Sequence, residues 1–130
     1  AIIDEKANMI LLGKKEGEEY WRLIGGFVDP KKGFSDEALE DTVKREALEE
    51  TNVIVDNVTY VGSYFVDDWR YRGEVDSMMS VFFKANCDHG VLARAGDDIV
   101  AVNWFPVERK TLEIIGPKSH GTMFEALLKT

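Results

Sequence analysis

Three glutamates fall close together in the segment Lys44–Asn52, whose sequence is KREALEETN. Glu49 and Glu50 follow Glu46 by three and four residues, so a helix places all three carboxylates near one face. Like charges at this spacing each cost about 0.2–0.5 kcal/mol, and the negative end of a helix dipole costs an exposed anion roughly 0.3–1 kcal/mol more. This repulsion needs an offset, and a bound cation would supply one.

Oxygen ligands of this kind suit a hard divalent cation, Mg²⁺ or Mn²⁺, better than zinc, which prefers nitrogen and sulfur. Arg45 lies four residues before Glu49 and can hold its carboxylate in one rotamer. The upstream pair Gly25 and Gly26 lets a backbone carbonyl approach a metal because no Cβ stands in the way. A glutamate-rich helix end facing solvent is the alternative interpretation of the glutamates alone.

The glutamates are expected on one helix of about sixteen residues, spanning 36–51. Ser35 is expected as its N-cap, with Asp36 and Glu37 in the first turn, where the helix dipole favours anions. Asn52 is expected as a left-handed C-cap. Apolar residues recur at helical spacing and predict a buried stripe formed by Ala38, Leu39, Val43, Ala47 and Leu48.

The rest of the chain predicts mostly strands, rich in branched and aromatic residues. They are expected over residues 1–4, 8–13, 20–24, 58–66, 75–85 and 99–105. Pro106 is expected to end the last strand, and a second amphipathic helix is expected over 119–129. Because helices alternate with strands, the predicted fold class is α+β or a layered α/β/α sandwich.

The chain has 130 residues and is expected to form a single domain over residues 1–130. Its net charge is −8 and no basic stripe is visible, so nucleic acid is not expected as a partner. No stretch is long and apolar enough to cross a bilayer, so no membrane association is expected. The single cysteine, Cys87, cannot form an internal disulfide, which suits the predicted cytoplasmic location.

The segment Gly25–Val53, with GGFVDP at its start and REALEETNV at its end, resembles the Nudix box. That box is the signature of hydrolases that cleave nucleoside diphosphates linked to another group. The resemblance implies a Nudix-like α/β/α sandwich with a mixed β-sheet. It implies Mg²⁺ as the cofactor, with Mn²⁺ as an alternative, and a set of metal ligands consisting of Glu46, Glu49, Glu50 and the Gly26 carbonyl. These glutamates and Arg45, which braces one of them, are the candidate catalytic residues.

This chain departs from the box pattern at two places. Lys32 occupies the position six residues after Gly26, where the pattern has a glutamate, whereas Glu37 lies eight residues before Arg45 as the pattern asks. The loop and first helical turn are therefore about five residues longer than the pattern, and the role of Glu37 stays open. Asn52 stands where the box normally has glycine. Because Asn tolerates a positive φ, this change is expected to have little consequence.

Segments 67–83 and 95–107 look like the Nudix subset that acts on ADP-ribose and similar dinucleotides. Arg70 and Arg72 could each contact a diphosphate, and Trp69 could stack on adenine or ribose. Glu74 could add a carboxylate or act as general base. The alternative for these residues is a half-buried edge strand with solvated side chains.

The resulting hypothesis is magnesium-assisted hydrolysis of a pyrophosphate bond, most simply of ADP-ribose to AMP and ribose 5-phosphate. Clustering is expected to raise the pKa of at least one glutamate in the metal-free protein. The expected partner is a small-molecule nucleotide substrate, and the oligomeric state stays open, with a homodimer as one option. Two alternatives remain: a hydrolase of free nucleoside or deoxynucleoside triphosphates that releases pyrophosphate, and a non-catalytic nucleotide-sensing Nudix domain.

A few other polar and aromatic positions call for separate interpretation. Cys87 and His89 are too few ligands for a structural zinc site. Trp21 is expected in the core, and the pair Asp97–Asp98 is expected to cap the turn before a strand. His120 is expected either to brace a loop or to contact substrate.

Overall fold

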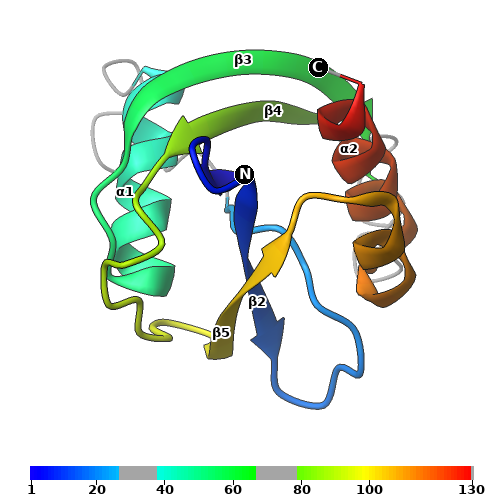
Figure 1. Cartoon of the computed structure of the whole chain (residues 1–130), viewed down its shortest axis with the longest axis horizontal. Helices are drawn as coiled ribbons and strands as arrows, with labels where there is room; N and C mark the ends of the chain where they lie inside the picture. Colours follow the sequence, from blue (N-terminus) through cyan, green and yellow to red (C-terminus); the bar gives the residue numbers. More distant parts are fainter. Residues whose placement is uncertain (27–37, 67–78, 130) are drawn as a thin grey trace.

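The computed structural model describes residues 1–26, 38–66 and 79–129 (Figure 1). In chain order the elements are β1 (Ile2–Asp4), β2 (Met9–Lys15), α1 (Leu39–Thr51), β3 (Asp56–Phe65), β4 (Met79–Asn86), β5 (Ile99–Pro106), the 3-10 helix η2 (Arg109–Ile114) and α2 (Lys118–Leu128). The strands form one sheet in the order β3-β4-β1-β2-β5. β1 pairs in parallel with β4, and the other neighbouring strands are antiparallel, so the sheet is mixed.

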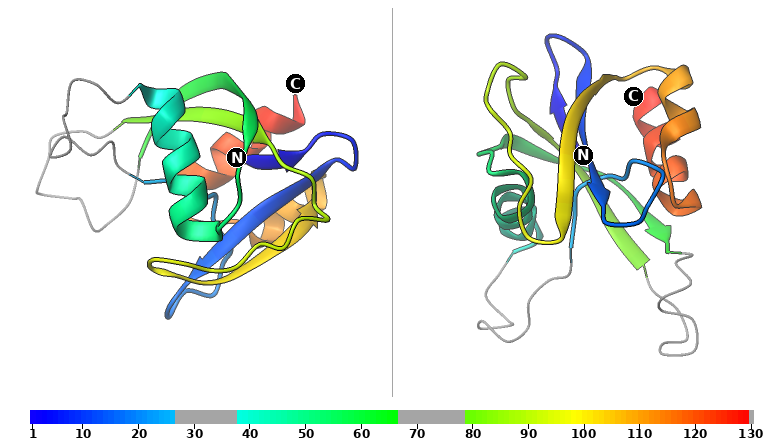
Figure 2. Two further views of the ribbon diagram at one scale, coloured as in Figure 1. Left: turned by 90° about the vertical axis from the view of Figure 1, so that its left-hand side faces the viewer. Right: turned by 90° about the horizontal axis from the view of Figure 1, so that it is seen from below.

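The two α-helices cover opposite faces of this sheet (Figure 2). Successive residues of a strand point to opposite faces, and both faces here are apolar. One face packs against α2 through a buried cluster of Ile3, Ile10, Leu12, Leu23, Phe82, Met123, Phe124 and Leu127. The other packs against α1 through Ile2, Leu11, Ala47, Val53, Val55, Ala85 and Cys87. The predicted α/β/α sandwich with a mixed sheet is therefore confirmed.

The predicted strand over 20–24 is wrong as a full strand. Only isolated bridges form there, one between Arg22 and Gly13 and one between Trp21 and Ile115. Trp21 donates to the carbonyl of Ile114, and Arg22 exchanges backbone hydrogen bonds with Gly13 of β2. From Leu23 onward the N–H groups of Leu23 and Gly25 donate to side chains instead, those of His120 and Glu50. Because the backbone pairing is not repeated beyond Arg22, no strand extends through this segment.

The helix that carries the glutamates begins later than the sequence predicts. Ala38 is its N-cap, with φ −67° and ψ 152°, and its carbonyl accepts from the N–H groups of Asp41 and Thr42. The predicted N-cap, Ser35, lies outside the described residues. At the other end Asn52 has φ 60° and ψ 27°, so the predicted left-handed C-cap is confirmed.

The predicted apolar stripe of this helix is only partly correct. Leu39 is 38% exposed and Leu48 is 51% exposed, whereas Ala47 is buried and Val43 packs against the α1-side cluster. The buried side chains of α1 are Thr42, Ala47, Glu50 and Thr51. Leu48 lies two residues from Glu50, roughly on the opposite side of the helix. The helix thus turns a carboxylate toward the sheet and a leucine toward solvent.

The remaining elements follow the predicted ones closely. β3, β4, β5 and α2 overlap the strands and helix expected over 58–66, 75–85, 99–105 and 119–129, and Pro106 is the last residue of β5. Residues 75–78 of the strand expected over 75–85 lie outside the described part. The helix η2 was not expected, because its six residues have no apolar periodicity. No helix in the described part of the chain has the length and apolar character needed to span a membrane.

Replacing Phe124 with alanine is expected to cost about 3–5 kcal/mol of unfolding free energy, because the ring is fully buried between α2 and the sheet. Urea unfolding followed by circular dichroism measures the loss. Leu92→Ala, at a side chain that is 74% exposed, is the control and should change stability by less than about 0.5 kcal/mol. Equal losses in the two variants would contradict this description of the core.

Candidate functional site

Arg45 fastens two of the three glutamates on α1. Its Nη1 donates to Oε1 of Glu46 at 3.0 Å and to Oε2 of Glu49 at 3.2 Å. The Arg45 side chain is about one-fifth exposed, so both ion pairs are partly shielded from water. The predicted contact that holds Glu49 is therefore present, and the same guanidinium also holds Glu46.

Glu50 is the most deeply buried carboxylate of the group, with 4% of the residue exposed. One of its oxygens, Oε1, accepts a hydrogen bond from the backbone N–H of Gly25 at 3.1 Å. The glycine pair and the glutamates, which lie about twenty-five residues apart in sequence, thus meet directly in the fold.

The two glycines are not equivalent. A Cβ added at Gly26 would lie 2.5 Å from the carboxylate of Glu46, whereas one added at Gly25 would meet nothing within 4 Å. A side chain at position 26 would therefore require the Glu46 carboxylate to move. The contact places the Gly26 backbone beside the carboxylate. The predicted approach of its carbonyl to a metal ion stays a prediction.

The loop before β5 closes the other side of the site by capping the end of α1. The N–H of Arg94 donates to the carbonyl of Thr51, and the N–H of Gly96 donates to that of Glu50. The Asn52 side chain returns a bond to the carbonyl of Arg94. A Cβ at Gly96 would lie 2.4 Å from the backbone oxygen of Glu49, so a glycine is needed here as well.

This loop brings two further acidic residues to the glutamates. Ile99 donates to the carbonyl of Gly96 in the predicted turn, and Asp97 takes a φ of 53°. Asp98 forms an ion pair with Lys15, whose Nζ lies 3.0 Å from its Oδ2. The β2–β5 register shifts between Lys14 and Lys15, at the end of β2 where Lys15 lies. The sequence analysis missed Lys15 because its partner is more than eighty residues away.

The carboxylates differ in how easily they ionise. Burial, and then the negative charge of Glu46, raises the pKa of Glu50 to about 8, although the Gly25 N–H opposes the shift. Burial also raises the pKa of Glu46, against the Arg45 charge. Burial alone would raise the pKa of Asp98, but its hydrogen bond and charge interaction with Lys15 lower it below the ordinary value. The predicted rise in a glutamate pKa is confirmed, with burial as the larger cause.

These groups form a donor set that fits a hard divalent cation. Every side-chain ligand is a carboxylate oxygen, as Mg²⁺ and Mn²⁺ prefer, and two of the three glutamates hold their charge at an energetic cost. Arg45 and Lys15 offset part of that charge. In this conformation the glutamates do not bring three ligand atoms within 4.8 Å of one another among the described residues.

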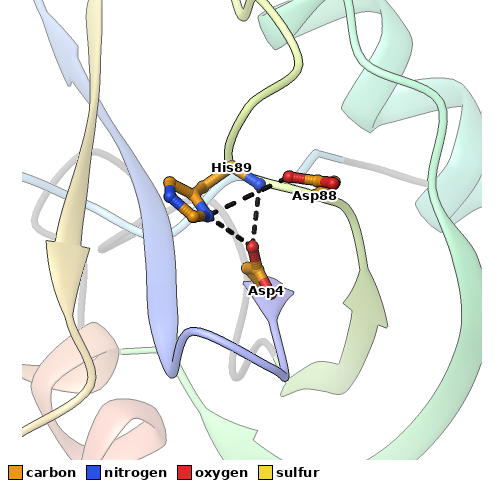
Figure 3. A group of neighbouring side chains, drawn as sticks. All are labelled: Asp4, Asp88 and His89. Carbon is orange, nitrogen blue, oxygen red and sulfur yellow. Dashed lines mark hydrogen bonds and ion pairs between the residues drawn. The ribbon is translucent and has the colours of Figure 1, made fainter.

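The tight group of ligand atoms in the described chain lies elsewhere, at Asp4, Asp88 and His89 (Figure 3). Asp4 accepts from the N–H of Lys6 and of Ala7 through Oδ1, and from the backbone and ring nitrogens of His89 through Oδ2. The backbone and ring hydrogen bonds from His89 hold the pKa of Asp4 far below its usual range. These contacts give the group a structural role, which ties the turn after β1 to the loop after β4.

Several other predicted positions have clear outcomes. Trp21 packs edge-on against Phe105, 5.0 Å between ring centroids, and belongs to the α2-side core, as predicted. His120 accepts a hydrogen bond from the N–H of Leu23. Of its two expected roles, bracing a loop or contacting substrate, the structure shows the first. The proposed substrate contacts and the two loop positions lie outside the described residues: Trp69, Arg70, Arg72, Glu74, Lys32 and Glu37.

An open hollow of about 880 Å³ lies between residues 15–21 and η2. Four of its lining residues are glutamates: Glu16, Glu18, Glu19 and Glu113. None of the three α1 glutamates lines it, and Lys15 is the one residue that it shares with the described contacts of the candidate site.

Comparison with known proteins connects this geometry to a family. The chain is 32% identical over 126 residues to the NAD-capped RNA hydrolase NudC of Vibrio cholerae, a match that covers 95% of this chain and 41% of that protein. The same enzyme of Vibrio parahaemolyticus matches at 32% identity, over 95% of this chain and 42% of that one. The chain thus spans less than half the length of these curated relatives.

Among solved structures, the NUDIX domain of Shewanella oneidensis NrtR, complexed with ADP ribose, superposes with a TM-score of 0.73 at 22% identity, over 93% of this chain and 76% of that one. The dihydroneopterin triphosphate pyrophosphohydrolase of E. coli superposes with a TM-score of 0.75 at 14% identity, over 95% and 88% of the two chains. At these identities the likeness shows the fold alone. The family model of the NUDIX domain matches residues 1–127, almost the whole sequence, and the chain belongs to the Nudix family.

Proposed function

We propose that this domain hydrolyses the pyrophosphate bond of a nucleoside diphosphate linked to another group, with ADP-ribose as its preferred substrate and AMP and ribose 5-phosphate as products. The observation that carries the proposal is the meeting of the α1 glutamates with the glycine pair. Glu50 accepts a hydrogen bond from the Gly25 N–H, and Gly26 lies so close to the Glu46 carboxylate that an added Cβ would displace it. A solvated helix end would need neither contact.

Each residue of the site has a role in this proposal. Glu46, Glu49, Glu50 and the carbonyl of Gly26 hold divalent cations, most simply Mg²⁺. When bound, such ions lower the pKa of a coordinated water and screen the charge of the diphosphate. Arg45 keeps Glu46 and Glu49 in fixed rotamers. Lys15 holds Asp98 beside the site and limits the repulsion among the carboxylates.

Two different substrates have support from similar proteins. The NrtR domain was solved with ADP ribose, and the two Vibrio relatives are named NAD-capped RNA hydrolases. The NAD cap of an RNA is therefore the second candidate substrate. It would make RNA a partner, against the prediction from net charge that no nucleic acid binds. The retained glutamates speak against a purely sensing domain, because such a domain needs no cation-binding carboxylates.

Gly26→Ala is expected to lower kcat by about a hundredfold or more, because its Cβ would displace the Glu46 carboxylate. Gly25→Ala is the matched control, since its Cβ meets nothing, and should retain activity within about threefold. Initial rates at saturating Mg²⁺ measure both variants. Equal activity in the two would remove Gly26 from the site.

Without metal, ionised Glu50 is expected to destabilise the protein as the pH rises. The pKa of Glu50 in the folded protein is about 8, above the ordinary 4.5, so folding favours the protonated carboxyl. The stability that this group contributes is fully present below pH 4.5 and is lost as the pH rises through 8. Between pH 5 and 9 the wild type should lose, relative to Glu50→Gln, on the order of a few kcal/mol. Thermal unfolding in EDTA measures the difference. Glu49→Gln, at a side chain that is 40% exposed, is the control. Parallel curves for wild type and Glu50→Gln would contradict the burial argument.

Substrate choice is tested by hydrolysis of a panel at fixed Mg²⁺: ADP-ribose, NADH, diadenosine polyphosphates, sugar nucleotides, nucleoside triphosphates and an RNA with a 5′ NAD cap. We expect ADP-ribose to have the highest kcat/KM and to yield AMP. Glu49→Gln and Glu50→Gln should each lower that value on the order of a hundredfold or more.

Release of pyrophosphate from triphosphates as the leading reaction would reject the proposed substrate and keep the site. Faster cleavage of the capped RNA would favour the second candidate. Nucleotide binding with no turnover of any substrate would reject the enzyme and favour a sensor.

A further inference from the structure

The segment that carries the glycine pair is held through alternate backbone N–H groups. Trp21 donates to the carbonyl of Ile114 at 2.8 Å, Leu23 to Nδ1 of His120 at 3.0 Å, and Gly25 to Oε1 of Glu50 at 3.1 Å. In an extended chain, alternate N–H groups point to the same edge, as in a strand that pairs with a neighbour. Here the three N–H groups on that edge donate in turn to a carbonyl, an imidazole and a carboxylate.

The opposite edge is held at Arg22, whose N–H and carbonyl exchange hydrogen bonds with Gly13 of β2 at 2.8 and 2.9 Å. Leu23 itself is buried in the α2-side core. The segment therefore crosses from the α2 side of the molecule, where Leu23 packs, to the α1 side, where Gly25 meets Glu50. His120 lies on α2, 97 residues from Leu23 in sequence.

We propose that His120 is a positioning residue for the glycine segment of the site. By accepting the Leu23 N–H, it fixes the register in which Gly25 reaches Glu50 and Gly26 lies against Glu46. Nδ1 can accept only when it carries no proton, so the ring is held as the neutral tautomer with its proton on Nε2. Without this acceptor, a buried N–H two residues before the glycine pair would have to find another partner, and the segment would shift.

This inference rests on the proposed function in one respect, that the glycine segment and the glutamates together bind a divalent cation. Its test therefore measures cation binding directly. Mn²⁺ affinity is determined by electron paramagnetic resonance for the wild type, His120→Leu, His120→Asn and Thr122→Val. Asparagine places Oδ1 close to where Nδ1 lies in histidine and keeps an acceptor, whereas leucine removes it. Thr122 is exposed on the same helix and bonds only within it, to the carbonyl of Lys118, among the contacts described.

We expect His120→Leu to weaken Mn²⁺ binding about 10–100-fold, as the loss of an outer contact to a metal site does. His120→Asn and Thr122→Val should stay within about twofold of the wild type. Wild-type affinity in His120→Leu, or an equal loss in His120→Leu and His120→Asn, would overturn the proposal. Glu50→Gln separates the two hypotheses. If this variant binds Mn²⁺ as the wild type does, the proposed metal site is wrong. If Glu50→Gln loses affinity and His120→Leu does not, only the proposed role of His120 is wrong.

A second measurement does not depend on the variants folding. In uniformly ¹⁵N-labelled wild-type protein, a hydrogen bond from the Leu23 amide to Nδ1 gives a scalar coupling between these two nitrogens. We expect that coupling, together with the chemical shifts of an imidazole protonated at Nε2. A neutral ring protonated at Nδ1, with no coupling to Leu23, would overturn the proposal.

Discussion

The buried carboxyl group of Glu50 is the constraint around which the site is arranged. Burying a carboxylate is unfavourable unless it finds charge or hydrogen-bonding partners. Here the side chain receives one N–H, from Gly25, while its own backbone carbonyl accepts the N–H of Gly96. One residue of α1 thus joins the glycine segment on one side to the loop before β5 on the other. The pKa of about 8 shows that these contacts do not fully compensate the cost of burying the charged carboxylate.

Two acidic groups in this molecule show how the same kind of side chain serves different ends. Asp4 is also buried, but it accepts four hydrogen bonds, including the ring and backbone nitrogens of His89, and its pKa lies far below the usual range. Among the described contacts Glu50 accepts one hydrogen bond, from Gly25, and it has a negative neighbour, Glu46; its pKa lies far above the usual range. A carboxylate with a full set of donors belongs to the scaffold, whereas one left short of them is suited to a cation.

The two faces of the sheet cooperate in building the site. α1 supplies the carboxylates on one face, and α2 packs its apolar residues on the other. The segment of residues 21–26 connects them, because Leu23 lies in the α2-side core and Gly25 contacts Glu50. The position of the glycine pair therefore depends on packing that is remote from the glutamates, on the opposite face of the sheet.

The sequence by itself determined the family and the layered fold, and it supplied the candidate residues of the site. Local signals suffice for these: the KREALEETN spacing, the glycine pair, the left-handed position of Asn52 and the alternation of apolar residues. Only the tertiary structure decided that Glu50 is buried and Leu48 exposed, because the direction of a helix face depends on what packs against it. It alone joined Lys15 to Asp98 and His120 to Leu23. Such pairs leave no local pattern, since the partners lie more than eighty residues apart and meet only when the sheet and both helices are assembled.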